Sequence, residues 1–207
     1  MIGGGIGLFG GSFNPIHNGH LIAARSVAEL LSLSRLVLIP SANPPHKSGN
    51  YLAGTDHRMA MARLAVADEP RFEVSDLEVR RTGPSYTILT VEAYRQSLGP
   101  EVTIHWIIGA DTLPELHTWY HVSELVELCR IVTAARPGFE SPDLSSLTAS
   151  LSPARIQQLR DRILPTPGID ISATDIRHRV RQGRSIRYLV PDAVRDYMAK
   201  HGLYRGK

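Results

Sequence analysis

Cysteine is almost absent from this 207-residue chain, and that scarcity excludes an internal disulfide. Cys129 is the only cysteine and lies in an apolar stretch, where a small buried side chain is its expected role. A lone cysteine fits a reducing compartment, so we expect a cytoplasmic protein. No apolar run approaches the ~20 residues that span a bilayer, and no basic segment precedes an apolar one at the N-terminus. We therefore expect neither a signal peptide nor a membrane partner.

The chain also lacks a strong excess of either charge. Its 23 Lys and Arg against 20 Asp and Glu give a net charge of +3, and the pI is about 9.2. So mild an excess suits an anionic small ligand as well as nucleic acid, and alone it decides nothing. With 43% apolar and 21% charged residues, the composition is that of an ordinary globular protein.

Short apolar stretches alternate with amphipathic helical patterns, and no internal repeat is visible. This alternation predicts an α/β fold, a Rossmann-like doubly wound parallel sheet, in which ligands bind beyond the carboxyl ends of the strands. The expected strands are 6–9, 35–40, 71–75, 102–108 and 131–134, and the expected helices are 19–31, 56–67, 86–98 and 123–128.

The C-terminal part has a different pattern. Residues 139–152 have little periodicity and predict a mobile surface loop, followed by a short strand at 169–171. Ser172 is placed to cap a helix over 173–182, and a final helix is expected over 192–201. We expect a single domain over residues 1–207, with a small helical portion from about residue 172.

Neither of the two common nucleotide-binding loops is present. From Ile6 to Leu21 the chain reads as an apolar strand, a turn on two glycines and the start of a helix, a layout that aims backbone N–H groups at a phosphate. His17 and His20 stand three residues apart and share one face of the first helical turn. Gly19 keeps that face bare, so a ligand can approach closely.

The histidine pair has two other interpretations, two surface histidines or half of a metal site. Zinc needs three or four ligands, and no further Cys, Asp or Glu falls in motif spacing. Contact with a phosphate is therefore the favoured interpretation. The stretch from Gly10 to Pro15 (GGSFNP), followed by His17 to His20 (HNGH), resembles the signature of the nucleotidylyltransferases with an (H/T)-x-G-H motif. That resemblance implies nucleotidyl transfer.

The chemistry accounts for the lack of a carboxylate pair near this loop. A phosphate monoester that attacks an α-phosphorus is already an anion at neutral pH, because its second pKa lies near ~6. It needs in-line positioning and relief of charge repulsion rather than a general base. The histidines would act as donors to the phosphorus centre. We expect Mg²⁺ held mainly by the ATP phosphates and water, and no metal site made by the protein.

Further motifs follow in the order of the same family. Residues 171–177 resemble its C-terminal S-x-T-x-x-R motif, and there the hydroxyls and free amides of a second helix start form another anion cradle that the Arg177 fork can reach. Residues 43–47 resemble its P-P-H-(K/R) loop, 109–111 its G-x-D segment, and 136–138 its R-P-G segment. The resemblance covers nearly the whole chain.

One segment points to the second substrate. Residues 84–87 (PSYT) resemble the ring-binding segment of bacterial nicotinate-nucleotide adenylyltransferases. We expect Ser85 to cap the helix, leaving the Tyr86 and Thr87 amides as unpaired donors for a small carboxylate. Two interpretations of the aromatic residues remain: Trp119 stacks on a cationic pyridinium ring, a cation–π contact of ~1–2 kcal/mol, or Tyr86 and Trp119 both belong to the core.

The resemblance implies an enzyme that adenylylates nicotinate mononucleotide with ATP, with no nucleic acid as partner. Phosphopantetheine adenylyltransferase and an enzyme for nicotinamide mononucleotide are rivals, and a nucleotide-sensing or nucleic-acid-binding module is an alternative of another class. The basic helix 176–184 is expected to be a solvated flank near an anionic pocket. The oligomeric state is left open, a homo-oligomer included. The implied site residues are His17, His20, Lys47 and Arg177 for catalysis; Gly10, Gly11, Ser12, Phe13, His20, Gly109, Asp111, Ser172, Thr174 and Arg177 for ATP; and Asn43, Lys47, Ser85, Tyr86, Thr87, Trp119 and Arg136 for the nicotinate nucleotide.

Overall fold

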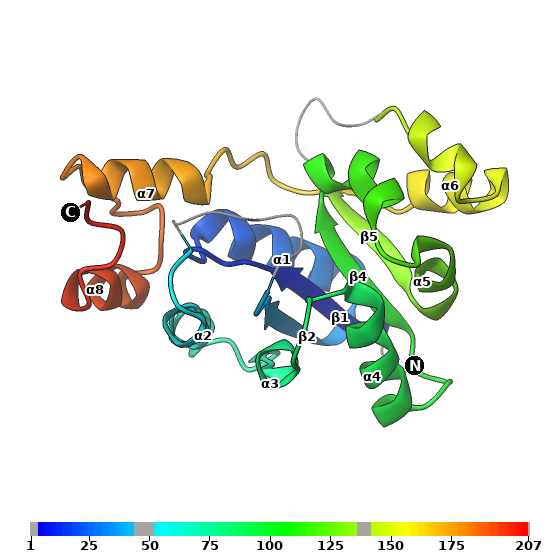
Figure 1. The fold of residues 1–207 in the computed structure, drawn as a ribbon, viewed down its shortest axis with the longest axis horizontal. Coiled ribbons are helices and arrows are strands. Elements are labelled where there is room, and N and C mark those ends of the chain that lie inside the picture. Colours follow the sequence, from blue (N-terminus) through cyan, green and yellow to red (C-terminus); the bar gives the residue numbers. More distant parts are fainter. Residues whose placement is uncertain (1–3, 44–51, 136–141, 207) are drawn as a thin grey trace.

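The computed structural model describes residues 4–43, 52–135 and 142–206. Within them a parallel sheet has the strand order β3-β2-β1-β4-β5-β6 (Figure 1), so the chain starts in the middle of the sheet and winds outward in both directions. This order is that of a doubly wound Rossmann-type sheet, as the sequence predicts. The strands are β1 (Gly4–Gly11), β2 (Leu33–Pro40), β3 (Phe72–Val74), β4 (Ile104–Gly109), β5 (Arg130–Ala135) and β6 (Ile163–Pro165).

Helices cover both faces of this sheet. Beyond the four helices that the sequence predicts between the strands, a short helix precedes α4, two 3₁₀ helices follow β4 and β5, and one α-helix precedes β6. The helices are α1 (Asn18–Leu30), α2 (Thr55–Ala65), α3 (Leu77–Arg80), α4 (Thr87–Leu98), η1 (Ala110–Thr118), α5 (Val122–Leu128), η2 (Ser145–Ala149), α6 (Pro153–Arg160), α7 (Ala173–Arg181) and α8 (Asp192–Lys200).

Alternate residues of the central strands enter two separate cores. In β2, Leu36 and Leu38 pack with residues of α1, α2, α7 and α8, whereas Val37 and Ile39 pack with residues of α4, α5 and α6. Successive strand side chains point to opposite faces, so an unbroken apolar run is buried on both sides. This explains why strands without apolar–polar alternation form the centre of the sheet.

Two sequence predictions about the region after β5 are wrong. The strand expected at 169–171 is not formed; the strand at the sheet edge is β6, whose Leu164 pairs with Ala134. Residues 136–141 lie outside the described part of the chain. The rest of the expected mobile loop is ordered by burial, because Leu144, Leu147 and Leu151 pack in the core around η2. A single 3₁₀ turn contains too few apolar residues for its helical periodicity to be recognised in the sequence.

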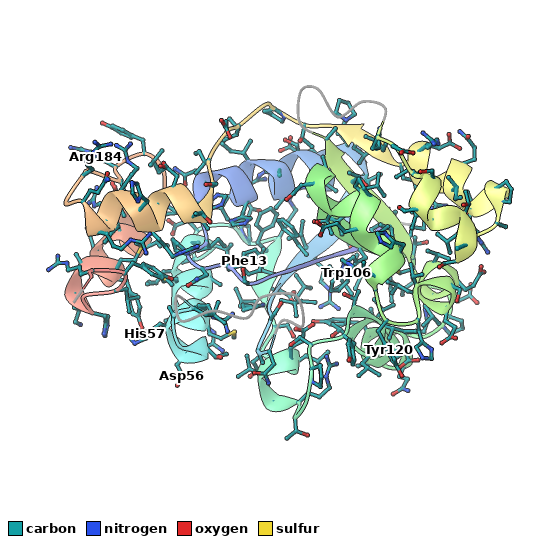
Figure 2. The ribbon with its side chains drawn as sticks, turned by 45° about the horizontal axis from the view of Figure 1, so that its top comes forward. Phe13, Asp56, His57, Trp106, Tyr120 and Arg184 are labelled. Atoms are coloured by element: carbon teal, nitrogen blue, oxygen red, sulfur yellow. The ribbon has the colours of Figure 1, made fainter. Side chains whose placement is uncertain are left out.

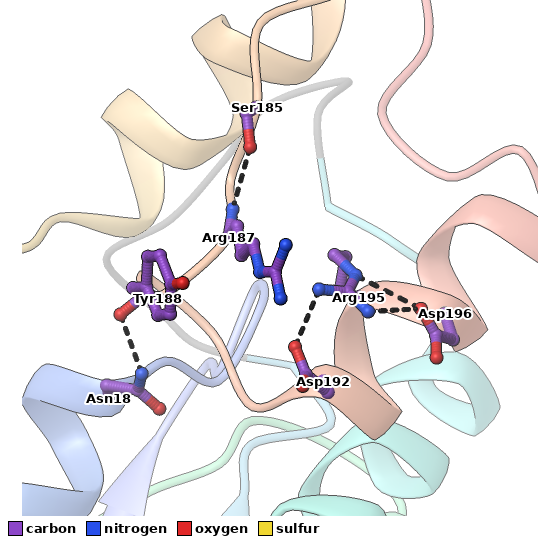
Figure 3. A network of polar contacts seen from close by, with 7 residues as sticks. All are labelled: Asn18, Ser185, Arg187, Tyr188, Asp192, Arg195 and Asp196. Atoms are coloured by element: carbon purple, nitrogen blue, oxygen red, sulfur yellow. Dashed lines mark hydrogen bonds and ion pairs between the residues drawn. The ribbon is translucent and has the colours of Figure 1, made fainter.

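The C-terminal helices α7 and α8 lie together at one end of the molecule, beside α2 (Figure 1). Ser172 is the N-cap of α7 as predicted, since its Oγ accepts the Asp175 N–H at 3.0 Å. The loop between the two helices is fastened to the start of α1. Asn18 Nδ2 donates to Tyr188 O at 2.7 Å (Figure 3), and the Asn18 N–H donates to Leu189 O at 2.9 Å. The end of the chain is thereby held beside the glycine loop near its beginning.

In the described residues, no helix is both long enough and apolar enough to cross a bilayer.

Candidate active site

The two motif histidines form a reciprocal capping box at the start of α1. His17 is the N-cap, and its Nδ1 accepts the His20 N–H at 3.3 Å, while His20 Nδ1 accepts the His17 N–H at 3.2 Å. The rings are stacked with centroids 3.6 Å apart. An imidazole nitrogen that accepts a hydrogen bond carries no proton, so we assign the neutral tautomer with its proton on Nε2 to both rings. With Nδ1 as the acceptor, Nε2–H is the donor of each ring.

Glycines allow the close packing around this pair. A Cβ on Gly19 would lie 3.1 Å from His17 Nδ1, and a Cβ on Gly10 would lie 2.5 Å from Trp106 Cζ2. Any other residue at these two positions would displace a ring that lines the site. Phe13 lies near the middle of the molecule (Figure 2) and packs edge-on against His20, with centroids 5.2 Å apart. The histidines are therefore held rigidly before any ligand binds.

A cavity of about 220 Å³ lies in front of the pair, beyond the carboxyl ends of β1 and β4. Phe13, one of the residues implied for ATP, is buried beneath this cavity instead of lining it. A Cβ on Gly109 would lie 2.7 Å from Asp111 Oδ1, so glycine lets the carboxylate fold back beside the strand end. Seven of the implied ATP or catalytic residues are brought together here: Gly10, Gly11, Ser12, His17, His20, Gly109 and Asp111.

A second cavity, of about 230 Å³, adjoins the first and shares its glycine wall at Gly10 and Gly11. Ser85, Tyr86, Thr87 and Trp119, which the resemblance assigns to the nicotinate nucleotide, line it. Two rings that sequence reasoning missed also line this cavity, Trp106 in β4 and Tyr120. Tyr120 stacks on Tyr86 with centroids 4.4 Å apart; Trp106 and Tyr120 are labelled in Figure 2. The position of Tyr120 directly after Trp119 is a sequence signal that could have placed it in the same cavity.

The predicted role of Ser85 as a helix cap is wrong. Its Oγ accepts the N–H groups of Ala42 and Asn43, both at 3.1 Å, and thereby joins the loop after β2 to the start of α4. Tyr86 is the N-cap, and its N–H donates to Pro84 O at 2.9 Å, so this amide is not the unpaired donor that was expected. The Thr87 N–H, at the first helical position, remains a donor without an intrahelical acceptor.

The C-terminal motif meets the N-terminal loop from the other side. Arg177 Nη1 donates to Asn14 O at 2.8 Å and Nη2 to Thr174 Oγ1 at 3.1 Å. Burial lowers the pKa of the Arg177 guanidinium from its usual value. Ile171, directly before the cap residue Ser172, lies 3.5 Å from the position of a Cβ on Gly19. The starts of α1 and α7 are therefore neighbours, although Ser172, Thr174 and Arg177 are not among the described residues that line the two cavities.

Three implied nucleotide contacts remain to be placed. Asn43 is exposed at the end of the loop after β2, and its Nδ2 donates to Gly83 O at 3.2 Å. Lys47 and Arg136 lie outside the described residues.

Comparisons with known proteins agree with this arrangement. Residues 8–179 match the model of the cytidylyltransferase-like family. A protein of Thermomicrobium roseum, 43% identical over 97% of this chain and 91% of its own length, is named as a nicotinate-nucleotide adenylyltransferase, as is one of Roseiflexus sp. strain RS-1, 46% identical over 97% and 98%. The chain belongs to the nicotinate-nucleotide adenylyltransferase family.

Solved structures support the fold. A Plasmodium falciparum nicotinic acid mononucleotide adenylyltransferase complexed with NaAD superposes with a TM-score of 0.75 at 18% identity, covering 96% of both chains. A nicotinate-nucleotide adenylyltransferase structure from Vibrio parahaemolyticus gives a TM-score of 0.69 at 19% identity, covering 98% of this chain and 96% of that one. At such identities the likeness concerns the fold, and it is that of the Rossmann-like sheet predicted from the sequence.

Sequence reasoning missed the buried arginine behind the glycine loop of this family member. Arg58 in α2 is 0% exposed. Its guanidinium donates to the carbonyl oxygens of Ser12 at 2.9 Å, Ser41 at 2.6 Å and Ala53 at 2.9 Å. The loops that follow β1 and β2 are thus held by one side chain. A signal was available, since Arg58 stands three and four residues before Met61 and Ala62 on the apolar face of the helix.

The basic helix has a structural explanation. Four arginines, Arg181, Arg184, Arg195 and Arg205, line a cavity of about 500 Å³ between the ends of α7 and α8. Arg195 bonds to Asp192 at 2.6 Å and to Asp196 at 2.9 Å (Figure 3). Basic side chains near helix C-termini complement the negative end of the helix dipole. Arg181 and Arg184 are exposed, in agreement with the expected solvated flank.

Proposed function

We propose that this chain transfers the adenylyl group of ATP to nicotinate mononucleotide, giving nicotinate adenine dinucleotide and pyrophosphate for NAD synthesis. The observation that carries the proposal is the pair of adjoining cavities that share Gly10 and Gly11. One presents imidazole donors beside a helix start, as a polyphosphate requires. The other combines aromatic rings with a second helix start, as a flat ring bearing a carboxylate requires. The names of the relatives point to the same reaction.

In the proposed reaction a phosphate oxygen of nicotinate mononucleotide attacks the α-phosphorus of ATP. The new P–O bond forms as the bond to the β-phosphate oxygen breaks, and pyrophosphate leaves. The attacking phosphate is already ionised, so no proton must be removed. The Nε2–H groups of His17 and His20 donate to the oxygens on which negative charge grows, and their capping bonds hold them in place before the reaction starts. Arg177 and Lys47 would add positive charge along the triphosphate.

Mg²⁺ is the proposed divalent cation, carried by the phosphates. Among the described residues, no three His, Cys, Asp or Glu side chains gather as a metal-ligand group. Mg²⁺ prefers oxygen ligands and keeps several waters, so the phosphates of ATP would hold it. When bound, the ion neutralises charge on the leaving pyrophosphate.

For the second substrate, Trp119 would stack on the pyridinium ring and the start of α4 would hold its carboxylate. Trp119 and Thr87 line the same cavity. Donors at a helix N-terminus favour an anion over a neutral group, so the acid nucleotide should be preferred to the amide. Asn43 and Arg136 stay proposed contacts of the same nucleotide.

The deciding experiment identifies the product made from Mg-ATP with each pyridine nucleotide in turn. Purified protein should release pyrophosphate and form nicotinate adenine dinucleotide faster than NAD. Faster adenylylation of the amide nucleotide would refute the substrate assignment, and binding of both nucleotides without any pyrophosphate release would favour a sensing module. His20→Ala should lower turnover by about 100-fold, the scale of losing one transition-state donor, while the exposed His201→Ala serves as the matched control.

A further inference from the structure

A chain of buried polar groups supports the first turn of α4. Thr90 Oγ1 donates to Glu78 Oε1 at 2.8 Å, and both guanidinium nitrogens Nη1 and Nη2 of Arg81 donate to Thr90 Oγ1 at 3.2 Å. Arg81 Nη2 also donates to the carbonyl oxygen of Tyr86 at 3.4 Å. Thr90 is 0% and Glu78 4% exposed. Burying polar groups costs free energy unless they are hydrogen-bonded. Thr90 Oγ1 and Glu78 Oε1 are paired in this way, whereas Glu78 Oε2 has no hydrogen-bond partner among the described residues.

These contacts orient one peptide group of the proposed nicotinate cavity. The peptide bond from Tyr86 to Thr87 is trans, since the only cis bond among the described residues is the one before Pro15. In a trans peptide the C=O and the following N–H point in opposite directions. Tyr86 and Thr87 are among the described residues that line the cavity, and Arg81 is not. Because the Tyr86 carbonyl accepts from Arg81, this contact helps to fix the plane of the peptide, and with it the direction of the Thr87 N–H.

We propose that Arg81 is a positioning and specificity-determining residue, which aims the Thr87 N–H at the carboxylate of the nicotinate ring. The inference rests on the proposed function and adds a residue that acts through the backbone. Thr87 is the first helical residue, so its N–H has no intrahelical acceptor and is available to a ligand. A bond from this N–H to an ionised carboxylate is about twice as strong as one to a neutral carboxamide. Losing the alignment should therefore harm the acid nucleotide more than the amide.

The charges around the cavity agree with this assignment. Glu78 lines the cavity, and a negative charge there would repel a substrate carboxylate. Burial raises the pKa of Glu78 above its usual value, while the hydrogen bond from Thr90 and the charge of Arg81 oppose the shift. The positive Arg81 guanidinium lies close enough to Glu78 to offset the negative charge that this carboxyl group carries when it is ionised.

The test compares Arg81→Met with its neighbour Arg80→Met. Methionine keeps most of the stem of Arg81 and removes its donors. The Arg80 side chain is 77% exposed, and in the described part of the chain it pairs only with Asp76, at 2.6 Å. Arg80→Met therefore measures the effect of removing one positive charge from the residue adjacent to Arg81. In R81M we expect KM for nicotinate mononucleotide to rise about tenfold with kcat within twofold. KM for ATP and for nicotinamide mononucleotide should change less than twofold, as should every constant of R80M.

A second pair of variants tests the support of Arg81. Thr90→Val removes the hydroxyl with little change of volume, and Thr90→Ser keeps it. We expect T90V to lower the acid-to-amide ratio of kcat/KM in the same direction as R81M, and T90S to restore it. If R81M does not fold, the acid-to-amide ratio of kcat/KM in T90V and T90S tests the role of Arg81 instead. Thermal midpoints confirm that T90V and T90S are folded.

The outcomes separate the two proposals. An unchanged acid-to-amide ratio in R81M, or equal losses for both nucleotides, would assign Arg81 a purely structural role while the wild type still prefers the acid. A wild-type enzyme that prefers the amide nucleotide would overturn this inference together with the substrate assignment.

Discussion

Replacing Arg58 with methionine should weaken both the fold and the binding of ATP. The guanidinium is fully buried and donates to the carbonyl oxygens of Ser12, Ser41 and Ala53, and also to Thr55 Oγ1 at 3.1 Å. No carboxylate pairs with it in the described part of the chain, and burial lowers its pKa from the usual value. The side chain keeps its charge because its neighbours are arranged as acceptors around it.

The magnitude follows from the acceptors that would lose their donor. Each of the three carbonyl oxygens gives up a hydrogen bond from a charged group, and a buried acceptor left unpaired costs about 1–3 kcal/mol. The three residues are partly exposed, so water can compensate in part and the low end of that range applies. We expect Arg58→Met to lower the free energy of unfolding by about 4 kcal/mol. For a chain of this length that corresponds to a fall in the thermal midpoint of about 10 °C.

Urea unfolding followed by circular dichroism measures the stability, and KM for ATP reports the glycine loop. Arg58→Lys keeps the charge but offers one nitrogen in place of three, so it should lose about half as much stability. Arg63→Met, on the exposed side of the same helix, is the control and should stay within ~0.5 kcal/mol of the wild type. A loss below 1 kcal/mol in R58M, with KM for ATP unchanged, would refute the view that Arg58 holds the loops.

Three further predictions concern the histidines and the cysteine. His17→Asn keeps a good helix cap, so unfolding should change by no more than about 1 kcal/mol, while pyrophosphate release falls at least tenfold because the Nε2–H donor is lost; retained turnover would remove His17 from the mechanism. Burial, with Arg130 and Arg162 nearby, lowers the pKa of His105 to about 4. Below pH 6.5 the unfolded chain binds a proton at His105 that the native state does not bind, so the free energy of unfolding should fall by about 3 kcal/mol between pH 6.5 and pH 4. Urea unfolding of His105→Gln should show a weaker dependence of stability on pH than the wild type. An equal dependence in both proteins would contradict this assignment. Burial raises the pKa of Cys129 to about 12, so a thiol reagent at pH 8 should modify the unfolded chain and spare the native one.

The parts of the fold that the sequence predicts are those with strong local signals. The apolar run at Leu36–Ile39 and the segment Ile104–Ile108, apolar except for the buried His105, are buried on both faces of the sheet. Segments of this kind are typical of central parallel strands. The histidine spacing likewise placed His17 and His20 on one turn, because the geometry of a helix start is local. These features depend on residues close together in the chain.

The misassigned parts depend on partners far away in the chain. β6 has only three residues and exists because Leu164 pairs with Ala134 of β5, so nothing in its own composition distinguishes it from 169–171. Ser85 resembles a helix cap locally, yet its hydroxyl is taken by amides of the loop after β2. A residue that can cap a helix can also accept from any other backbone N–H brought beside it, and only the tertiary structure decides between them.

Residues from the C-terminal part of the chain also hold the glycine loop in place. Asn14 lies at its centre: its Oδ1 accepts the Tyr204 hydroxyl at 2.7 Å and the Ala53 N–H at 3.0 Å, and its carbonyl oxygen accepts from Arg177. The Tyr204 hydroxyl is buried, which raises its pKa and keeps it protonated as the donor. Since Arg177 and Tyr204 follow the last strand, the geometry of the glycine loop depends in part on the packing of the C-terminal helices. The C-terminal helices α7 and α8 add no strand to the sheet, but Arg177 of α7 and Tyr204 after α8 contribute contacts that hold the glycine loop after β1.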